Sequence, residues 1–323
     1  MAFTFAIISA LLTRKSNCFR TPAVSHLTLH KYARRWIRSS PNGISPADLA
    51  MCMTSTQHTD IEVEQKFFLG SSASDMAALE SRLVSLGFQR VNGEVSFMDW
   101  YFDTPAPYWT LTRRDNWLRY RELLISQPGL VEGRNADTNA FKKQGSWQLK
   151  RGLTQTGQAT VYEEYEGTAA IDRSVDMIQN TGDDCDDDER TLSVNIDQEL
   201  LKDGHAMPQL PIEFKQHALL PFARFETKRS SWSNVDRTSK FNDLTIDIDW
   251  TDFGYTVGEV EAIVQSENEI EGARDMIRRL IELIGDTDGK VGGAALGKLE
   301  TFMISRDEDH YLACVEAGSM KKT

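Results

Sequence analysis

Charged and apolar residues alternate in one short segment of the chain, Ile61-Glu62-Val63-Glu64-Gln65-Lys66-Phe67. In a β-strand, successive side chains point to opposite faces of the sheet. Glu62, Glu64 and Lys66 would therefore share one face, and the apolar residues would share the other. Two carboxylates and one ammonium group in a row suit a divalent cation and an anionic group held side by side. A solvated strand face would show the same alternation, so this segment alone leaves both interpretations open.

The same one-sided distribution of charge recurs in at least four other segments with strand-like composition. The residues that would face the same way are Trp117, Arg119 and Arg121; Lys150, opposite Trp147 and Leu149; Tyr162, Glu164 and Glu166; Asp247 and Asp249; and Glu259 and Glu261. Both signs of charge are represented, which exposure to solvent explains poorly.

Facing charges of both signs would suit a bound triphosphate. Basic side chains neutralise phosphate oxygens, and arginines can bind them bidentately; the candidates are Lys66, Arg119, Arg121, Lys150 and Arg229. A hard cation such as Mg²⁺ would lie against carboxylates, with Glu62, Glu64, Asp247, Glu259 and Glu261 as candidates. Without a ligand, we expect the two sets to pair partly with each other. An interior network of salt bridges without catalysis is the alternative, although buried ion pairs are weak stabilisers.

Hydrophobic periodicity predicts eight strands and three helices within one contiguous region. The strands are expected at 61–69, 88–103, 117–125, 146–151, 158–167, 222–236, 242–250 and 254–264, and the helices at 73–87, 268–284 and 294–306. Ser74 is the predicted N-cap of the first helix, and Gly87 is its predicted end. A long hairpin loop is expected at 126–145 and a solvated acidic loop at 182–189, while 168–221 as a whole is difficult to assign. The pattern favours a sheet whose apolar face packs outward on helices and whose charged face lines a channel.

Composition narrows the class of protein. The chain has 323 residues, a formal net charge of -12 and 40% hydrophobic residues, which is enough for a substantial core. The acidic balance disfavours a broad nucleic-acid-binding surface. Its four cysteines are scattered without a CxxC pair, so a zinc site is not indicated and reduced thiols are expected. We also find no Ser-His-Asp or Cys-His grouping.

The N-terminal segment differs in composition from the rest. Residues 1–47 contain no Asp or Glu but carry seven Lys and Arg residues among many hydroxyl and alanine side chains. This composition is typical of a mitochondrial transit peptide. A secretory signal would need a basic region before the apolar run Ala2–Leu12, and that run is too short to span a membrane. A leader without function, with Met51 or Met53 as the true start, would instead leave a cytoplasmic protein. We therefore expect a basic leader at 1–55, one folded domain at 56–310 and a C-terminal tail at 311–323.

Several motifs together resemble a known family. The pattern Glu-x-Glu-x-Lys at 62–66 resembles the defining motif of the CYTH superfamily of triphosphate-tunnel enzymes. Further runs resemble the thiamine triphosphatases within it, and they are Asp103-Thr104-Pro105, Trp117-Leu118-Arg119-x-Arg121-Glu122, Trp147-x-Leu149-Lys150, Thr227-Lys228-Arg229-Ser230-x-Trp232 and Asp252-Phe253-Gly254-Tyr255-x-Val257-Gly258-Glu259-Val260-Glu261-Ala262. Their order and approximate spacing agree over residues 60–306.

The resemblance implies an α+β fold, with an eight-stranded antiparallel β-barrel forming the tunnel and helices packed outside. It also implies Mg²⁺-dependent hydrolysis of thiamine triphosphate by a monomer without a nucleic-acid or membrane partner. By motif match and shared strand face, the metal side would be Glu62, Glu64, Asp247, Asp249, Glu259 and Glu261. The substrate side would be Lys66, Arg119, Arg121, Lys150, Arg229 and Lys298, with Glu164, and with Trp117 stacking on the thiamine.

Two further expectations concern catalysis. Tyr101 shares a strand face with Asp103, and we expect Lys66 to lower the pKa of Tyr101 so that the pair orients or deprotonates the attacking water. Two other functions remain open, which are an inorganic tripolyphosphatase and a non-catalytic triphosphate-binding module. The motif at 62–66 alone would also fit adenylyl cyclase and RNA triphosphatase relatives.

Overall fold

A computed structural model describes residues 60–69, 72–124, 145–154, 159–180, 206–234, 236, 238–285, 291–292 and 294–322. The chain divides into Met1–Gln57 and His58–Thr323, and the fold below belongs to the second unit. The basic leader, the acidic segment at 182–189 and all of the loop at 126–145 except Gly145 lie outside the described residues. The mitochondrial location therefore stays a prediction from composition.

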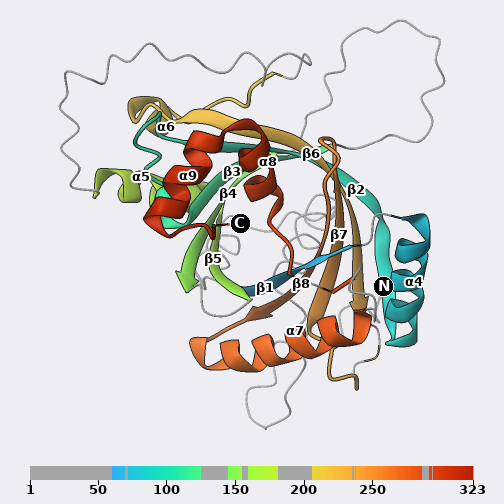
Figure 1. The fold of residues 1–323 in the computed structure, drawn as a ribbon. Coiled ribbons are helices and arrows are strands. Elements are labelled where there is room, and N and C mark those ends of the chain that lie inside the picture. Colours follow the sequence, from blue (N-terminus) through green and yellow to red (C-terminus); the bar gives the residue numbers. More distant parts are fainter. Residues whose placement is uncertain are drawn as a thin grey trace, which may run out of the picture. The chain divides into compact units, whose positions relative to one another are not determined.

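Eight antiparallel strands close into a barrel (Figure 1). They are β1 (Ile61–Phe68), β2 (Phe88–Asp103), β3 (Asn116–Leu124), β4 (Gly145–Thr154), β5 (Thr160–Glu166), β6 (Leu220–Asn234), β7 (Leu244–Thr251) and β8 (Thr256–Val264). Their order around the barrel is β1-β5-β4-β3-β2-β6-β7-β8. All eight lie where the sequence predicts strands, and the expected barrel is confirmed.

Strand β1 closes the barrel by joining two consecutive runs of strands. One run is β2 to β5 and the other is β6 to β8, and they pair directly through β2 and β6. Strand β1 pairs with β5 along one edge and with β8 along the other. Closure leaves none of the described strands with a free edge and gives the barrel an inner and an outer face.

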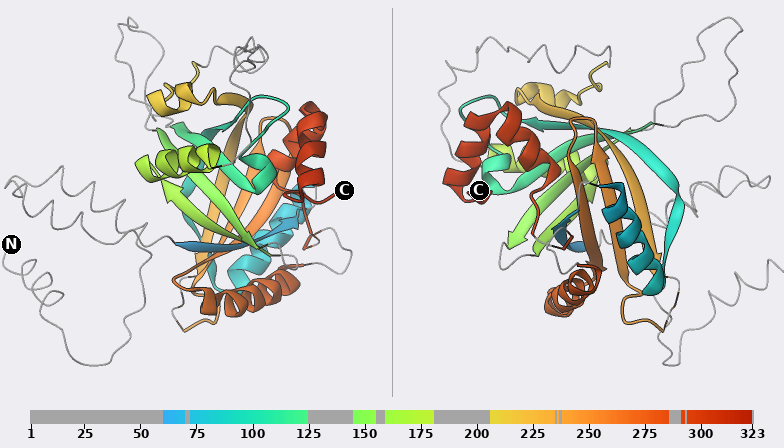
Figure 2. Two further views of the ribbon diagram at one scale, coloured as in Figure 1. Left: turned by 90° about the vertical axis from the view of Figure 1, so that its left-hand side faces the viewer. Right: turned by 45° about the vertical axis from the view of Figure 1, so that its right-hand side comes forward.

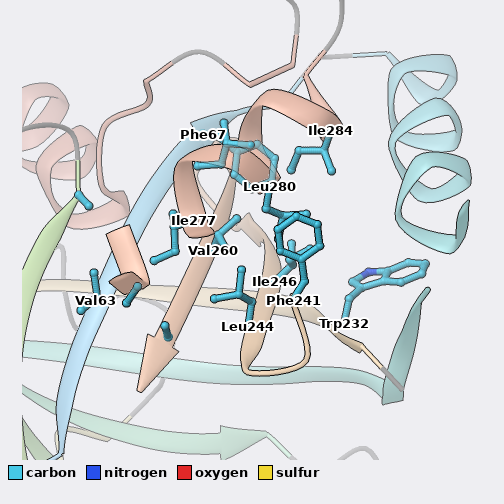
Figure 3. Packing of buried hydrophobic residues seen from close by; sticks show 14 of the residues in the cluster. Val63, Phe67, Trp232, Phe241, Leu244, Ile246, Val260, Ile277, Leu280 and Ile284 are labelled. Atoms are coloured by element: carbon cyan, nitrogen blue, oxygen red, sulfur yellow. The ribbon is translucent and has the colours of Figure 1, made fainter. Parts of the chain in front are cut away.

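The alternation predicted for the strands is present, and the apolar side chains of β1, β7 and β8 pack outward. Val63, Phe67, Ile246 and Val260 are fully buried in one cluster, shown in Figure 3. The cluster is covered by helices α4 (Ala73–Ser85) and α7 (Ile270–Ile284), the latter packing on β1 and β8 (Figure 2). The charged faces of the same strands consequently turn inward.

Helix α4 begins at Ala73, as the predicted range 73–87 has it, but its N-cap lies two residues before the predicted one. Its N-cap is Ser72, whose side chain accepts a hydrogen bond from the Asp75 amide while the Asp75 carboxylate accepts one from the Ser72 amide. Ser74 was the expected cap, and this detail is wrong because only Ser72 stands three residues before an acidic partner that completes the capping box.

A second outer cluster forms on β2, β3 and β4. It contains Trp100, Phe102, Leu118 and Leu149 and is covered by α5 (Thr168–Gln179) and α6 (Ile212–Gln216). Both helices lie in the part of the sequence that could not be assigned. Two 3-10 turns, Thr112–Arg114 and Glu267–Glu269, complete the connections around the described strands.

The C-terminal helices pack differently. Helix α8 (Lys298–Arg306) places Leu299 and Met303 in a third cluster with Tyr101 and Phe225, which belong to the inward-facing rows of β2 and β6. Helix α9 (Glu308–Ala317) adds the buried side chains Tyr311 and Cys314, so part of 311–323 is helical. Helix α8 thus covers the inner side of these strands. No helix among the described residues is long and apolar enough to cross a membrane.

The closeness of β1 and β8 depends on Gly258, and replacing it tests this packing. Gly258 lies opposite Phe67, and a Cβ there would lie 2.2 Å from Phe67 Cζ. We expect Gly258→Ala to lower the free energy of unfolding by about 1–3 kcal/mol, because the ring must move in a packed core. Urea denaturation measures the change.

Gly272 provides the matched control for this substitution. A Cβ at Gly272, in α7, would meet nothing within 4 Å. Gly272→Ala should therefore raise the free energy of unfolding by roughly 0.5–1 kcal/mol through helix propensity. Wild-type stability for Gly258→Ala would show that the β1–β8 contact is looser than described.

Candidate active site

Among the described residues, six basic and eight acidic side chains form clusters of opposite charge inside the barrel. The basic residues are Lys66, Arg119, Arg121, Lys150, Arg229 and Lys298, and the acidic residues are Glu62, Glu64, Asp99, Glu164, Asp247, Asp249, Glu259 and Glu261. Strand register explains several pairs, because Lys66 lies opposite Glu259, Lys150 opposite Glu164 and Arg229 opposite Asp249. The expected mutual pairing of the two sets is confirmed.

One group of ion pairs forms around strand β1. Lys150 Nζ lies 2.6 Å from Glu62 Oε2, 2.9 Å from Glu64 Oε2 and 3.4 Å from Glu164 Oε1. Lys66 pairs with Glu64 and lies 3.1 Å from a Glu259 oxygen. A single ammonium group thus bridges carboxylates from two strands, which fixes both near one another.

A second group forms where β6, β7 and α8 meet. Arg229 donates two hydrogen bonds of 2.7 Å to the two oxygens of Asp249, and it also pairs with Asp247. Lys298, the first residue of α8, reaches Asp249 as well. Two cations therefore share the Asp249 carboxylate, and Arg229 and Lys298 lower its pKa to about 2 although burial opposes this.

A third group joins β2 to β3. Arg121 Nε and Nη2 each donate a 2.7 Å hydrogen bond to Asp99, which is fully buried. Arg119 Nη1 lies 3.9 Å from the same carboxylate, and its Nε donates to Gln148 Oε1 at 2.8 Å. Burial opposes ionisation of Asp99, but Arg121 and Arg119 lower its pKa.

Not every interior carboxylate is ionised. Burial raises the pKa of Glu261 to about 8, and repulsion from Asp247 and Glu259 contributes to the shift. Burial also raises the pKa of Glu62 well above its usual range, although Lys150 opposes this. Retained protons lessen the repulsion between crowded carboxylates.

Trp117 lies at the margin of the charged interior. It is opposite Lys150 in the β3–β4 register, and its Nε1 donates a 2.8 Å hydrogen bond to Asp115 Oδ1. The partly buried indole packs against the cluster containing Tyr101 and Leu299. An aromatic surface therefore adjoins the row of cations.

The expected pairing of Tyr101 with Lys66 is wrong. Tyr101 is buried in the third apolar cluster, with its ring centroid 5.6 Å from that of Phe225. Burial raises the pKa of Tyr101, and its charged neighbours are Arg119, Asp99 and Arg121 rather than Lys66. The reason is topological, since β1 and β2 lie on opposite sides of the barrel, with three strands between them in either direction.

Two interior residues were not selected from the sequence. Asp99 shares a strand face with Tyr101, so extending the alternation of β2 by two residues would have found it. Tyr162 lies opposite Glu62, and its ring centroid is 5.4 Å from Lys150 Nζ. Its shared face with Glu164 was visible in the sequence, but a tyrosine in a strand carries no distinctive signal.

The acidic residues provide suitable oxygen ligands for a hard cation. Burial, with repulsion from Asp247 and Glu259, raises the pKa of Glu261, and a divalent cation could replace the proton that it retains. Asp247 Oδ1 is buried without a hydrogen-bond partner among the described residues. Across that same part of the chain, however, no three His, Cys, Asp or Glu side chains are already arranged as a metal site. A cation would have to displace protons and ammonium groups.

Comparison with known proteins finds a matching family model and several similar chains. The model of the CYTH domain family matches residues 60–291. The chain is similar to the thiamine-triphosphatase of Homo sapiens, with 30% identity over 227 residues that cover 70% of this chain and 77% of the human protein. It is also similar to the thiamine-triphosphatase of Macaca fascicularis, with 28% identity over 266 residues, covering 81% and 92% respectively. A solved structure from Pyrococcus horikoshii covers 76% of this chain and 99% of its own, with 13% identity and a TM-score of 0.42.

Removing the Asp99 carboxylate should show that Arg121 depends on it. Asp99→Asn would leave the buried guanidinium without its anion, and we expect a loss of about 3–5 kcal/mol in the free energy of unfolding. Added tripolyphosphate should raise the lowered thermal midpoint of Asp99→Asn part of the way back, because its anionic oxygens can pair with Arg121. The control is Asp275→Ala, which removes the exposed pair with Arg278 and should cost less than about 0.5 kcal/mol. Equal losses in the two variants would contradict this account.

The protonated state of Glu261 predicts a pH dependence of stability. Its ordinary pKa is 4.5, and in the folded protein it is about 8. Between these values the unfolded chain binds fewer protons, so the free energy of unfolding should fall as pH rises. Glu261→Gln cannot ionise and should lose less stability than the wild type between about pH 5 and about pH 8, without added metal.

Thermal midpoints measured at both pH values test this expectation. Glu271→Gln is the control, because the Glu271 side chain is 81% exposed, and it should follow the wild type. Parallel pH curves for the wild type and Glu261→Gln would rule out a buried proton at Glu261.

Proposed function

This chain belongs to the CYTH domain family, and on that premise we propose that it is a thiamine triphosphatase, which hydrolyses thiamine triphosphate to thiamine diphosphate and phosphate. Two thiamine-triphosphatases similar to it over most of its length support the proposal. The observation that carries it is structural, namely the convergence of Lys66, Lys150 and four other cations inside one barrel beside Trp117.

The cations are arranged to receive phosphate oxygens. Arg121 and Arg229 already hold carboxylates bidentately, which is the geometry in which a guanidinium binds phosphate. Lys66, Lys150 and Lys298 act as compact charges around them. Entry of a triphosphate would exchange carboxylate partners for phosphate oxygens without moving the cations far.

Enzymes of this family are metal-dependent, and we assign Mg²⁺ as the metal. Its proposed ligands are drawn from the carboxylates Glu62, Glu64, Asp247, Asp249, Glu259 and Glu261, which suit a hard cation. When bound, Mg²⁺ supplies charge neutralisation of the phosphate oxygens. Glu164, paired with Lys150, belongs to the substrate side and orients that ammonium group.

Positioning and charge account for catalysis in this proposal. Phosphoryl transfer passes through a loose, anionic transition state, so preorganised cations can stabilise it without covalent chemistry. Lys66 serves as one of these cations. Burial raises the pKa of Tyr101, and we therefore assign that residue no role as a base.

Trp117 is the proposed determinant of the thiamine end. The thiazolium ring is cationic, and an indole face attracts a cation by about 1–2 kcal/mol in a partly desolvated site. Lys150, one of the proposed phosphate-binding cations, lies opposite Trp117 in the β3–β4 pair. An inorganic tripolyphosphate would use the same cations but gain nothing from Trp117. A monomer without nucleic-acid or membrane partners remains our expectation.

Phosphate release from a panel of triphosphates tests the function. With Mg²⁺ we expect the highest kcat/KM for thiamine triphosphate, and with excess EDTA we expect loss of release. Trp117→Ala should lower kcat/KM for thiamine triphosphate by roughly tenfold while changing tripolyphosphate turnover little. Trp250→Phe, on the outward face of β7, is the control.

Two outcomes would contradict the proposal, and each would favour another function. Equal turnover of both substrates, unaffected at Trp117, would indicate an inorganic tripolyphosphatase. Tight calorimetric binding of thiamine triphosphate without phosphate release would indicate a binding module.

A further inference from the structure

Phe97, in β2, lies among three of the interior cations. Its ring centroid is 3.8 Å from Arg121 Cζ, 5.4 Å from Arg229 Cζ and 5.7 Å from Lys298 Nζ. The residue is only 3% exposed. Distances below about 6 Å to the ring centroid are those at which a cation is attracted to the π face.

The surroundings of Phe97 are unusual for a buried phenylalanine. It belongs to none of the three apolar clusters formed by the described residues. Its neighbours on the same face of β2 include Asp99, whose carboxylate binds Arg121. Hydrophobic packing alone therefore explains its position poorly.

The three cations come from separate parts of the fold, which are β3, β6 and α8. Arg229 and Lys298 share Asp249, and Arg229 also pairs with Asp247. Arg121 has Asp99. Like charges that converge in this way repel each other strongly where water is excluded. The negative potential of an aromatic face offsets part of that repulsion without adding a net charge that would compete with phosphate.

We propose that Phe97 is a positioning residue that holds Arg121, Arg229 and Lys298 together so that they can bind a triphosphate. It acts through these cations and does not touch the substrate. The inference rests on the proposed function only in requiring an anionic triphosphate. Because the cations bind phosphates, the effect should be the same for thiamine triphosphate and for tripolyphosphate.

Fluorinated phenylalanines at position 97 test the proposal. Adding one, two and three fluorine atoms weakens the negative π face progressively while nearly preserving the shape and apolarity of the ring. We expect kcat/KM for both triphosphates to fall stepwise, by about tenfold over the series, when every variant is assayed well below its thermal midpoint. Phe97→Leu, which has no π face, should lose at least as much.

Phe88 provides the matched control, because it is fully buried in an apolar cluster. The same fluorinated series there should leave kcat/KM unchanged. A flat series at position 97, or equal losses at both positions, would overturn the proposal. A fall at position 97 that disappears when all variants are assayed well below their thermal midpoints would also overturn it.

The test also separates this inference from the proposed function. If the wild type hydrolyses no triphosphate, the function fails, and tripolyphosphate affinity measured by calorimetry across the position 97 series becomes the readout. A stepwise loss of affinity would support the role of Phe97, and constant affinity would refute it.

Discussion

Closure of the sheet by β1 is the constraint on which the rest of the structure depends. Once β1 pairs with both β5 and β8, the charged rows of the strands face an enclosed interior. Removing charges from water costs several kcal/mol each unless an opposite charge is near. The interior therefore has to be nearly balanced, and Lys150 bridging carboxylates of β1 and β5 is a direct result. Closure of the sheet therefore determines both the pairing of interior charges and the presence of cations that can bind an anion.

Alternation within strands was the most informative property of the sequence. A period of two residues assigns each side chain to a face without knowledge of the fold, and this correctly joined Arg119 with Arg121 and Asp247 with Asp249. Alternation cannot identify which strands are neighbours. For this reason the pairing of Tyr101 with Lys66 was wrong, since β1 and β2 are separated in the barrel. Such pairings depend on long-range topology.

The helices show a different limit of prediction from the sequence. Helix α7 could be predicted because Ile277, Leu280, Ile281 and Ile284 form a continuous apolar stripe. The short α6 contributes a single fully buried side chain, Phe214, and α5 buries only small residues completely. Their assignment depends on the outer face of β4, which they cover, rather than on their own periodicity. The basic residue that opens α8, Lys298, likewise looks like an ordinary surface lysine until Asp249 is placed beside it.

The position of Lys298 in the chain has a consequence for biosynthesis. The last strand ends at Val264, but Lys298 follows it by a whole helix, α7, and a connecting segment. A ribosome therefore finishes all eight strands before it makes the cation that completes the pair at Asp249. A nascent chain that has just closed its barrel would hold Asp249 with Arg229 alone, and it would gain the remaining charge only when α8 docks.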